Sequence, residues 1–396
     1  MTRASQFVIE SKHRQHHHFL ANLKDFSYRE VESVALDRIV DDPRVSLYCL
    51  DDEARQAVFV DGPAAMDLVR APFVCRLQYE QARRIFTLPY EQLHRLAAHL
   101  PEVEHPIFVY TTGRSGSTLL HHAFNESQHV VSLSEPDAPT QLANLRHGTD
   151  GRRDVEICDL ARSVTRFFFR AYPRDGLVTC AVKLRSHGTQ VMDLFQLAFP
   201  RARNIFLYRQ ALAYVASGHR IYEKEGRVEF VSFEAWRARL EPSWGAVLSH
   251  LARYLERDDE PLSLVTELTL GWMASMEWYL AQVARGIPSL AVSYAALSQA
   301  REETLRRIFS YCDLPMSGIQ PALRAYERDS QAGTPLAREN PRKGNQRTLS
   351  AAQIATIKAM VGQHPALSDS IKEQNERSEE AEPSDLPSQP APRRSQ

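Results

Sequence analysis

The residues best able to do chemistry stand close together at 113–118, in the order Gly113-Arg114-Ser115-Gly116-Ser117-Thr118. An apolar run, IFVYT at 107–111, precedes them, and a helical pattern with one apolar face follows from Leu119. A strand that feeds a glycine turn into a helix N-terminus gathers backbone N–H groups around one point. The sequence therefore predicts an anion site here, most commonly for a phosphate.

This loop differs from the two best-known phosphate loops. A Walker A loop reads GxxxxGK[ST] and uses its lysine on the β- and γ-phosphates, but this loop has no lysine, and only two residues separate its glycines. A Rossmann GxGxxG is also absent. The next residues, His121 and His122, fall off the apolar face of the following helix, so we expect them on its exposed side.

Three later segments accompany the loop. The segment 201–220 reads as a strand that ends in Arg209, followed eight residues later by Ser217. A further strand–helix unit follows at 287–315, and a basic triplet closes the series with Arg342, Lys343 and Gly344. In this order the segments resemble the PAPS-dependent sulfotransferases, whose 5′-phosphosulfate loop has the core [KR]-S-G-[ST]-[ST]. The resemblance covers about 105–365.

The resemblance implies two anion sites, since 3′-phosphoadenosine 5′-phosphosulfate (PAPS) carries a 5′-phosphosulfate and a separate 3′-phosphate. The helix N-terminus supplies backbone donors for the first site. A guanidinium binds the second bidentately. The residues implied for this co-substrate are Arg114, Ser115, Gly116, Ser117, Thr118, Arg209, Ser217, Arg342, Lys343 and Gly344.

The resemblance also implies catalytic roles. Lys183 ends the run VTCAVK and corresponds to the strand-end lysine beside the sulfate, so Lys183 and Arg114 are the candidates to stabilise charge on the bridging oxygen. Glu135 is the candidate base, as in tyrosylprotein and carbohydrate sulfotransferases. Cytosolic members place a histidine two residues after the lysine, where this chain has Arg185, and His187 is the alternative base. No metal is required.

Two other functions remain open beside sulfuryl transfer to an acceptor hydroxyl. One is an ATP- or GTP-dependent phosphotransferase with a degenerate loop, and the other is a nucleotide-binding scaffold without catalysis. The motifs name neither the class of acceptor nor an oligomeric state. We expect residues 136–176, residues 219–285 and the N-terminal residues to select the acceptor.

Short apolar runs alternate with helical patterns from 105 to 365, which predicts an α/β domain with a doubly wound parallel sheet and helices on both faces, the P-loop NTPase-like sulfotransferase fold. Trp272, Trp278 and Tyr279 follow a helical spacing and are expected in the core. The expected strands are 106–112, 130–134, 178–183, 204–208 and 289–294, and the expected helices are 155–171, 191–199 and 263–285.

Residues 1–104 are expected to form an α+β accessory unit of their own. It contains a predicted hairpin at 45–50 and 57–60 and helical patterns at 79–86 and 90–100. The histidines at 13 and 16–18 lack the spacing of paired metal ligands and favour a solvated segment. Residues 373–396 are nearly devoid of apolar side chains, and residues 366–396 are expected to be a disordered tail.

The composition sets broad limits on the function. Lys and Arg number 48 against 49 for Asp and Glu, so the chain lacks the basic excess typical of nucleic-acid binders. Five scattered cysteines favour a reducing compartment over a disulfide framework. No apolar stretch is long enough for a membrane span or a signal peptide, so the expected location is cytoplasmic.

Overall fold

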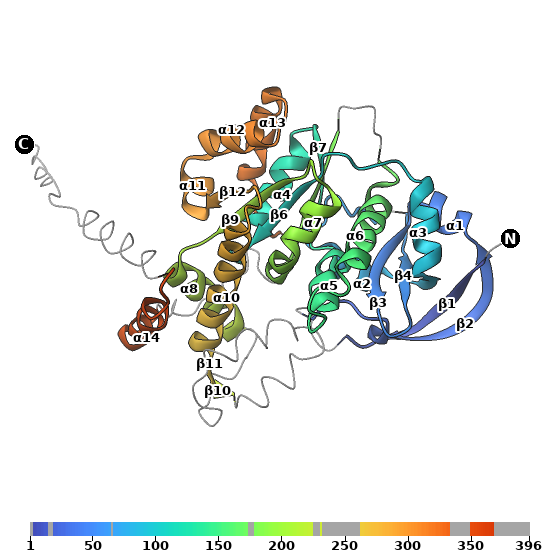
Figure 1. Ribbon diagram of the computed structural model, residues 1–396, viewed down its shortest axis with the longest axis horizontal. Helices are drawn as coiled ribbons and strands as arrows, with labels where there is room; N and C mark the ends of the chain where they lie inside the picture. The colour runs from blue at the N-terminus through green and yellow to red at the C-terminus, as the bar shows by residue number, and fades with distance from the viewer. Residues whose placement is uncertain are drawn as a thin grey trace, which may run out of the picture.

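The computed structural model describes residues 3–14, 19–64, 66–172, 178–224, 230–231, 262–332 and 349–367. They form two five-stranded sheets with helices between and around them (Figure 1). The mixed α/β architecture with a parallel sheet flanked by helices confirms the coarse fold class predicted from the sequence.

The parallel sheet has the strand order β12-β9-β6-β8-β7. Because β6 has the later strands β8 and β9 on its two sides, the chain leaves β6 at a topological switch point, where α/β sheets bind ligands. The expected strands are all present, each within one or two residues of its predicted bounds. They are β6 (Ile107–Thr111), β7 (Val130–Ser134), β8 (Thr179–Lys183), β9 (Arg203–Tyr208) and β12 (Leu290–Ser293).

Helices cover both faces of this sheet, as the alternation along β6 shows. Ile107 and Val109 belong to the buried cluster formed with α4, α12 and α13, whereas Phe108 and Tyr110 belong to the cluster on the opposite face. Phe108 packs on Phe195 with their ring centroids 4.5 Å apart. A strand buried on both faces explains the continuous apolar run. The helices of this part are α4 (Ser117–Glu126), α5 (Asp137–Arg146), α6 (Asp154–Phe169), α7 (Met192–Ala198), α11 (Tyr294–Gln299), α12 (Arg301–Tyr311) and α13 (Ile319–Leu323).

A second helical group packs beside the sheet around Trp272. Trp272 is 1% exposed, and Tyr279 stacks on Phe206 of β9 at 3.9 Å, so the prediction that these aromatic residues are core residues is confirmed. The group comprises α8 (Ala211–Lys224), α10 (Leu264–Ala284) and α14 (Ala351–Gly362), with the short strands β10 (Phe230–Val231) and β11 (Leu262–Ser263) nearby. Short 3-10 turns occur at η1 (Leu23–Asp25), η2 (Ser186–Val191), η3 (Met316–Gly318) and η4 (Arg324–Glu327).

The N-terminal sheet is antiparallel and has the order β2-β1-β5-β4-β3. The predicted hairpin is confirmed as β3 and β4, but the helix expected at 79–86 is wrong, because that stretch spans the end of α2 and the start of β5. In β5 the apolar residues of RIFTLP lie between two strands, so pairing overrides the local helical pattern. The elements are β1 (Arg3–Lys12), β2 (Phe26–Ala35), α1 (Asp37–Asp41), β3 (Val45–Asp51), β4 (Gln56–Asp61), α2 (Val74–Gln81), β5 (Arg84–Pro89) and α3 (Tyr90–His99).

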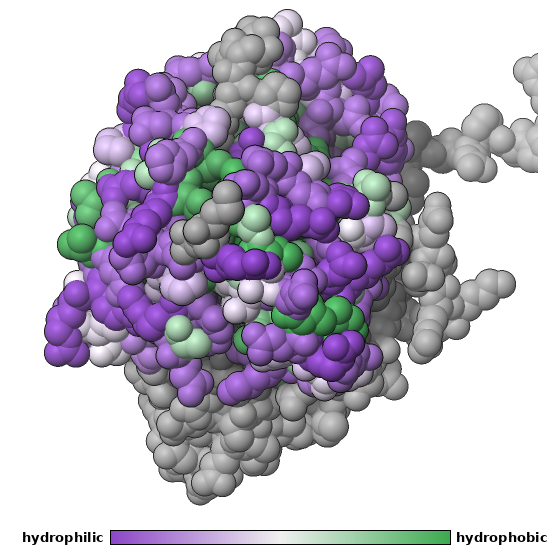
Figure 2. Space-filling view, turned by 90° about the vertical axis from the view of Figure 1, so that its right-hand side faces the viewer, coloured by the Kyte–Doolittle hydropathy of each residue, from purple (hydrophilic) through white to green (hydrophobic). Residues whose placement is uncertain are grey.

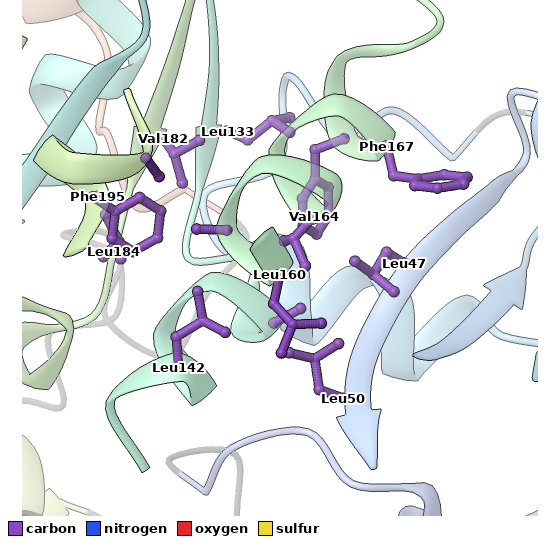
Figure 3. Close-up of a cluster of buried hydrophobic side chains, with 14 of the residues drawn as sticks. Leu47, Leu50, Leu133, Leu142, Leu160, Val164, Phe167, Val182, Leu184 and Phe195 are labelled. Atoms are coloured by element: carbon purple, nitrogen blue, oxygen red, sulfur yellow. The ribbon is translucent and has the colours of Figure 1, made fainter. Parts of the chain in front are cut away.

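One hydrophobic core joins the two sheets (Figure 3). Helix α6 carries Leu160, Val164 and Phe167, which lie between Leu47 of β3 and Val182 of β8. Phe167 meets Phe59 of β4 edge to face, with ring centroids 5.2 Å apart. The outward surface on the N-terminal side is mostly hydrophilic, with hydrophobic residues in small separate groups (Figure 2). A domain boundary at 104/105 stays a prediction.

The exposed position expected for His121 and His122 is wrong, since His121 is buried and His122 is partly buried. His121 is 1% exposed, and its Nδ1 lies 3.0 Å from Ser132 Oγ. The far side of α4 is covered by the segment before α2, where Asn125 Nδ2 donates to the carbonyl of Val69 at 2.8 Å. Burial lowers the pKa of both histidines. The local pattern misses this because the covering segment is distant in sequence.

Candidate active site

The 113–118 loop connects β6 to α4 in a conformation that needs its glycines. Gly116 caps α4 with φ +80°, and a Cβ there would lie 3.0 Å from both Leu297 and Tyr294. Gly113 has φ +83°. Thr111 steadies the turn, because its Oγ1 accepts a hydrogen bond from the N–H of Gly113 at 2.9 Å. The first N–H groups of α4 have no partner within the helix and are available to an anion.

A pocket of about 390 Å³ opens above this loop, at the carboxyl ends of β6, β8 and β9. All the described residues that the sequence assigned to the site line this pocket, apart from Ser217. They are Arg114, Ser115, Gly116, Ser117, Thr118, Glu135, Lys183 and Arg209. The triplet Arg342, Lys343 and Gly344 lies outside the described residues, so its role stays a prediction.

Two arginines gather on the β9 side of the loop. Arg114 Nε donates to Ser217 Oγ at 3.2 Å, and Arg209 Nη1 donates to the carbonyl of Arg114, also at 3.2 Å. Ser217 is therefore part of this cluster through Arg114. Burial lowers the pKa of Arg114, and the charge of Arg209 lowers it further. Burial is also the main reason that the pKa of Arg209 is lowered.

These two guanidiniums have no carboxylate partner among the described residues. Arg209 Nε is also buried and has no hydrogen-bond partner in that part of the chain. Two neighbouring, partly buried cations without a carboxylate partner in the described residues are costly, and a bound anion offsets that cost. The lower pKa values and the vacant donor therefore both favour an anionic ligand here.

Aromatic residues that the sequence did not single out for this site hold Arg209 in place. The guanidinium lies 4.5 Å from the ring centroid of Tyr294, at the start of α11. The indole N–H of Trp272 donates to the carbonyl of Arg209 at 2.7 Å. Trp272 was expected only as a core residue, and nothing in its helical spacing signals this second contact.

Lys183 and Glu135 form an ion pair on the β8 side of the loop. Lys183 ends β8 and its side chain is 3% exposed, whereas that of Glu135, just after β7, is 20% exposed. Arg114, bonded to Ser217, belongs instead with Arg209. The positions therefore favour a binding role for Arg114, and its second predicted role at the bridging oxygen stays a prediction.

His187, the alternative base, does not line the pocket. Its side chain is fully buried in η2, and burial, reinforced by the charge of Arg185, lowers its pKa to about 3. Of the two candidate bases, only Glu135 lies where a ligand in the pocket meets it.

The N-terminal region also reaches this pocket. Phe73, Cys75 and Arg76, at the start of α2, line it beside Lys183 and Glu135. Lys183 Nζ lies 5.6 Å from the ring centroid of Phe73. No motif marks these residues, because their place in the site depends on how α2 docks against the end of β7.

Other features of the described residues bear on cofactors and location. No group of three or more His, Cys, Asp or Glu side chains there is arranged to hold a metal ion. His16–His18 lie outside the described part of the chain. None of the described helices combines the length and the apolar character needed to cross a bilayer.

Comparison with known proteins gives structural neighbours only. No family model matches the chain, and no curated protein matches it in sequence. Mouse sulfotransferase SULT7A1, solved with PAP, overlaps with a TM-score of 0.41 at 11% identity, over 73% of this chain and 96% of that one. The sulfotransferase domain of the curacin biosynthetic pathway gives 0.39 at 14%, over 70% and 99%.

Sulfotransferase STF9 from Mycobacterium avium gives a TM-score of 0.37 at 12% identity, over 68% of this chain and 79% of that one. The predicted resemblance is confirmed to this extent: the structural neighbours named here are sulfotransferases. At these identities and TM-scores the likeness concerns the fold, and it assigns no donor, acceptor or residue role.

Proposed function

We propose that this protein transfers a sulfuryl group from PAPS to a hydroxyl of an acceptor. The observation that carries the proposal is the grouping of two different sites in one pocket. Arg114 and Arg209 are partly buried cations without a carboxylate partner among the described residues, and the Lys183–Glu135 pair lies across the 113–118 loop from them. One side suits an anion, and the other suits proton transfer.

The donor set fits the two charged groups of PAPS. The N–H groups at the start of α4 and the hydroxyls of Ser117 and Thr118 suit the 5′-phosphosulfate. Arg209, with its buried and unpartnered Nε, suits the 3′-phosphate, and Ser217 helps by holding Arg114 beside it. We include Arg342, Lys343 and Gly344 in this set on the resemblance alone.

Two residues of the chain have separate roles in the transfer. The S–O bond to the phosphate breaks as an S–O bond to the acceptor forms, and PAPS supplies the sulfuryl group. Glu135 accepts the proton that the acceptor hydroxyl loses. Lys183 places its ammonium where negative charge develops on the oxygen that leaves with the phosphate. Their ion pair keeps base and cation adjacent before the acceptor arrives.

The rest of the predicted organisation belongs to the same proposal. The loop at the β6 switch point and the sheet order support a P-loop NTPase-like sulfotransferase fold over 105–365. Residues 1–104 are the accessory unit, and Phe73 and Arg76 make it part of the acceptor side of the pocket.

Calorimetric titration tests the donor specificity. We expect 3′-phosphoadenosine 5′-phosphate to bind, AMP to bind at least tenfold more weakly because it lacks the 3′-phosphate, and ATP with Mg²⁺ not to compete. Tight binding of ATP with Mg²⁺ would instead support a phosphotransferase. A screen of hydroxyl acceptors with PAPS, read as product mass, then separates an enzyme from a non-catalytic scaffold.

A further inference from the structure

Glu135 has an unusual backbone. Its φ is +53°, in the left-handed region that residues other than Gly, Asn and Asp rarely adopt. Two main-chain hydrogen bonds fix the residue there. Its N–H donates to the carbonyl of Lys183 at 2.8 Å, and its carbonyl accepts from the N–H of Cys75 in α2 at 3.3 Å. A strained residue persists only where its surroundings enforce it, and such residues cluster at functional sites.

A buried ion pair lies two residues farther along both strand ends. Asp137, the first residue of α5, has a fully buried carboxylate, and Arg185 Nε lies 2.7 Å from its Oδ1. Arg185 Nη2 donates a hydrogen bond to Asp137 Oδ2 at 3.1 Å, so two guanidinium nitrogens contact the two carboxylate oxygens. Burial by itself lowers the pKa of Arg185, but Asp137, Cys75 and Glu135 together outweigh burial, and the pKa is raised. The guanidinium therefore stays charged.

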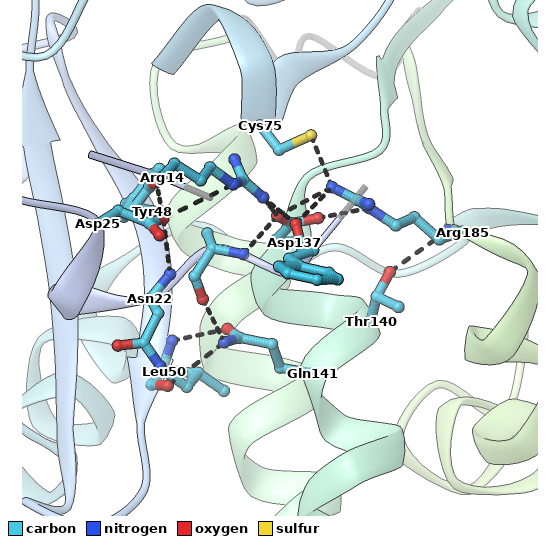
Figure 4. A network of polar contacts seen from close by, with 12 residues as sticks. Arg14, Asn22, Asp25, Tyr48, Leu50, Cys75, Asp137, Thr140, Gln141 and Arg185 are labelled. Atoms are coloured by element: carbon cyan, nitrogen blue, oxygen red, sulfur yellow. Dashed lines mark hydrogen bonds and ion pairs between the residues drawn. The ribbon is translucent and has the colours of Figure 1, made fainter. Parts of the chain in front are cut away.

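Contacts from the N-terminal region complete this network (Figure 4). The N–H of Ala21 donates to Asp137 Oδ2 at 2.7 Å, and Arg14 Nη2 donates to the same oxygen at 3.2 Å. Arg185 Nη2 also lies 3.1 Å from the Cys75 sulfur. Arg185 thus ties the end of β8 both to α5 and to the helix whose N–H holds the carbonyl of Glu135.

The two ion pairs follow each other along the ends of β7 and β8, with the second pair two residues after the first on each segment. Ser134 lies opposite Lys183 in the paired strands β7 and β8, so residues 135 and 137 and residues 183 and 185 leave the sheet side by side. Glu135 pairs with Lys183 in the pocket, and the buried Asp137 pairs with Arg185, which also lines the pocket. Fixing the inner pair fixes the backbone of the outer pair, because only Pro136 separates the two carboxylates.

We infer that the Arg185–Asp137 pair is a positioning device that holds Glu135 in its left-handed conformation, facing Lys183. The inference rests on the proposed function, in which Glu135 is the base. Arg185 stands where the resemblance places the histidine of cytosolic sulfotransferases. In this protein that residue positions the base.

The first test measures backbone strain and needs no activity. Glu135→Gly and Glu135→Ala both remove the carboxylate, so the difference between their unfolding midpoints reports the backbone at 135. Because glycine adopts positive φ freely, we expect the Gly variant to unfold about 1–2 °C higher. In an Arg185→Lys background, which keeps the charge but loses the guanidinium contacts to Asp137, this difference should fall by at least half. Asp137→Asn serves as the background if Arg185→Lys does not fold.

Asp313 provides the matched control for strain. It has the same φ of +53° and follows the C-terminal end of α12, outside the network. The Gly-minus-Ala difference at 313 should not respond to Arg185→Lys. An undiminished difference at 135 in the Arg185→Lys background would overturn the inference.

The second test separates positioning from general stability. Arg185→Lys should lower kcat at least tenfold and leave KM for PAPS within twofold, since the donor side of the pocket is untouched. Arg170→Lys is the control, because Arg170 is partly buried and donates to the carbonyls of Val40 and Asp42, away from the pocket. It should leave both constants unchanged, and an equal fall in kcat for Arg170→Lys would contradict positioning.

The two tests fail separately. If the wild-type protein transfers no sulfuryl group to any acceptor, the proposed function fails, and the strain measurement still decides whether Arg185 constrains residue 135. If the strain depends on Arg185 but kcat does not, Glu135 is not the base.

Discussion

The pocket has two walls with different origins. The loop 113–118 and Arg209 come from the parallel sheet, and each stands directly after its strand. Phe73, Cys75 and Arg76 come from the N-terminal region and reach the same pocket only through the docking of α2. The first wall is encoded locally, whereas the second depends on contacts between distant segments. The sequence therefore predicts the residues of the first wall but not those of the second.

The largest expected effect on activity concerns Glu135, which follows β7 of the parallel sheet. Glu135→Gln keeps the size of the side chain but removes the base, so we expect transfer to fall about 10²–10⁴-fold. Binding of 3′-phosphoadenosine 5′-phosphate, measured by calorimetry, should remain within threefold of wild type. Full activity in this variant would remove Glu135 from the mechanism.

The second prediction asks whether the N-terminal region and the parallel-sheet region unfold separately. Phe167→Ala removes a fully buried ring that touches Phe59 of the N-terminal sheet, and we expect a loss of about 3–5 kcal/mol in the free energy of unfolding. Because the core is shared, denaturation should remain a single transition by both near- and far-UV circular dichroism. Two resolved transitions would show that residues 1–104 unfold as an independent domain.

What the sequence predicts follows the same division. The strands of the parallel sheet are short apolar runs, and their bounds are predicted within one or two residues. The loop motif and Arg209 follow from local order along the chain. By contrast, β5 reads as helix, and the burial of His121 goes unseen, because each depends on partners far away in sequence. The strands β1 and β2 carry no apolar alternation strong enough to announce them.

The candidate site shows the same limit within single residues. Lys183 is recognisable as a strand-end lysine, but its partnership with Glu135 requires β7 and β8 to be neighbours. Arg185 is visible in the sequence only as a departure from the cytosolic histidine. Its contacts with Asp137 and Cys75 give it a structural reason.

The third prediction sharpens the assignment of the β9 side. Arg209→Met removes the charge and keeps an unbranched stem, and we expect the affinity for 3′-phosphoadenosine 5′-phosphate to fall about 10- to 100-fold, as for a lost charged hydrogen bond. The affinity for AMP should change little, because AMP has no 3′-phosphate. Equal losses for both nucleotides would place Arg209 elsewhere on the ligand.

The smallest expected effect on activity concerns His187. This residue follows β8 of the parallel sheet, but it is buried and does not line the pocket. His187→Gln should leave transfer within about threefold, whereas a loss comparable to that of Glu135→Gln would restore His187 as the base. The variant should instead change the pH dependence of stability. The pKa of His187 is lowered in the folded state to about 3, from an ordinary value of 6.5.

The sign of that change follows from proton binding. Below pH 6.5 the unfolded chain protonates His187 and the folded chain does not, so stability falls as the pH is lowered from 6.5 toward 3. One such group contributes a slope of about 1.4 kcal/mol per pH unit across that window. Urea unfolding of wild type and His187→Gln at pH 7.5, 6.0 and 5.0 measures it. The variant should lose less stability on acidification, and parallel pH profiles would mean that His187 is protonated equally well in both states.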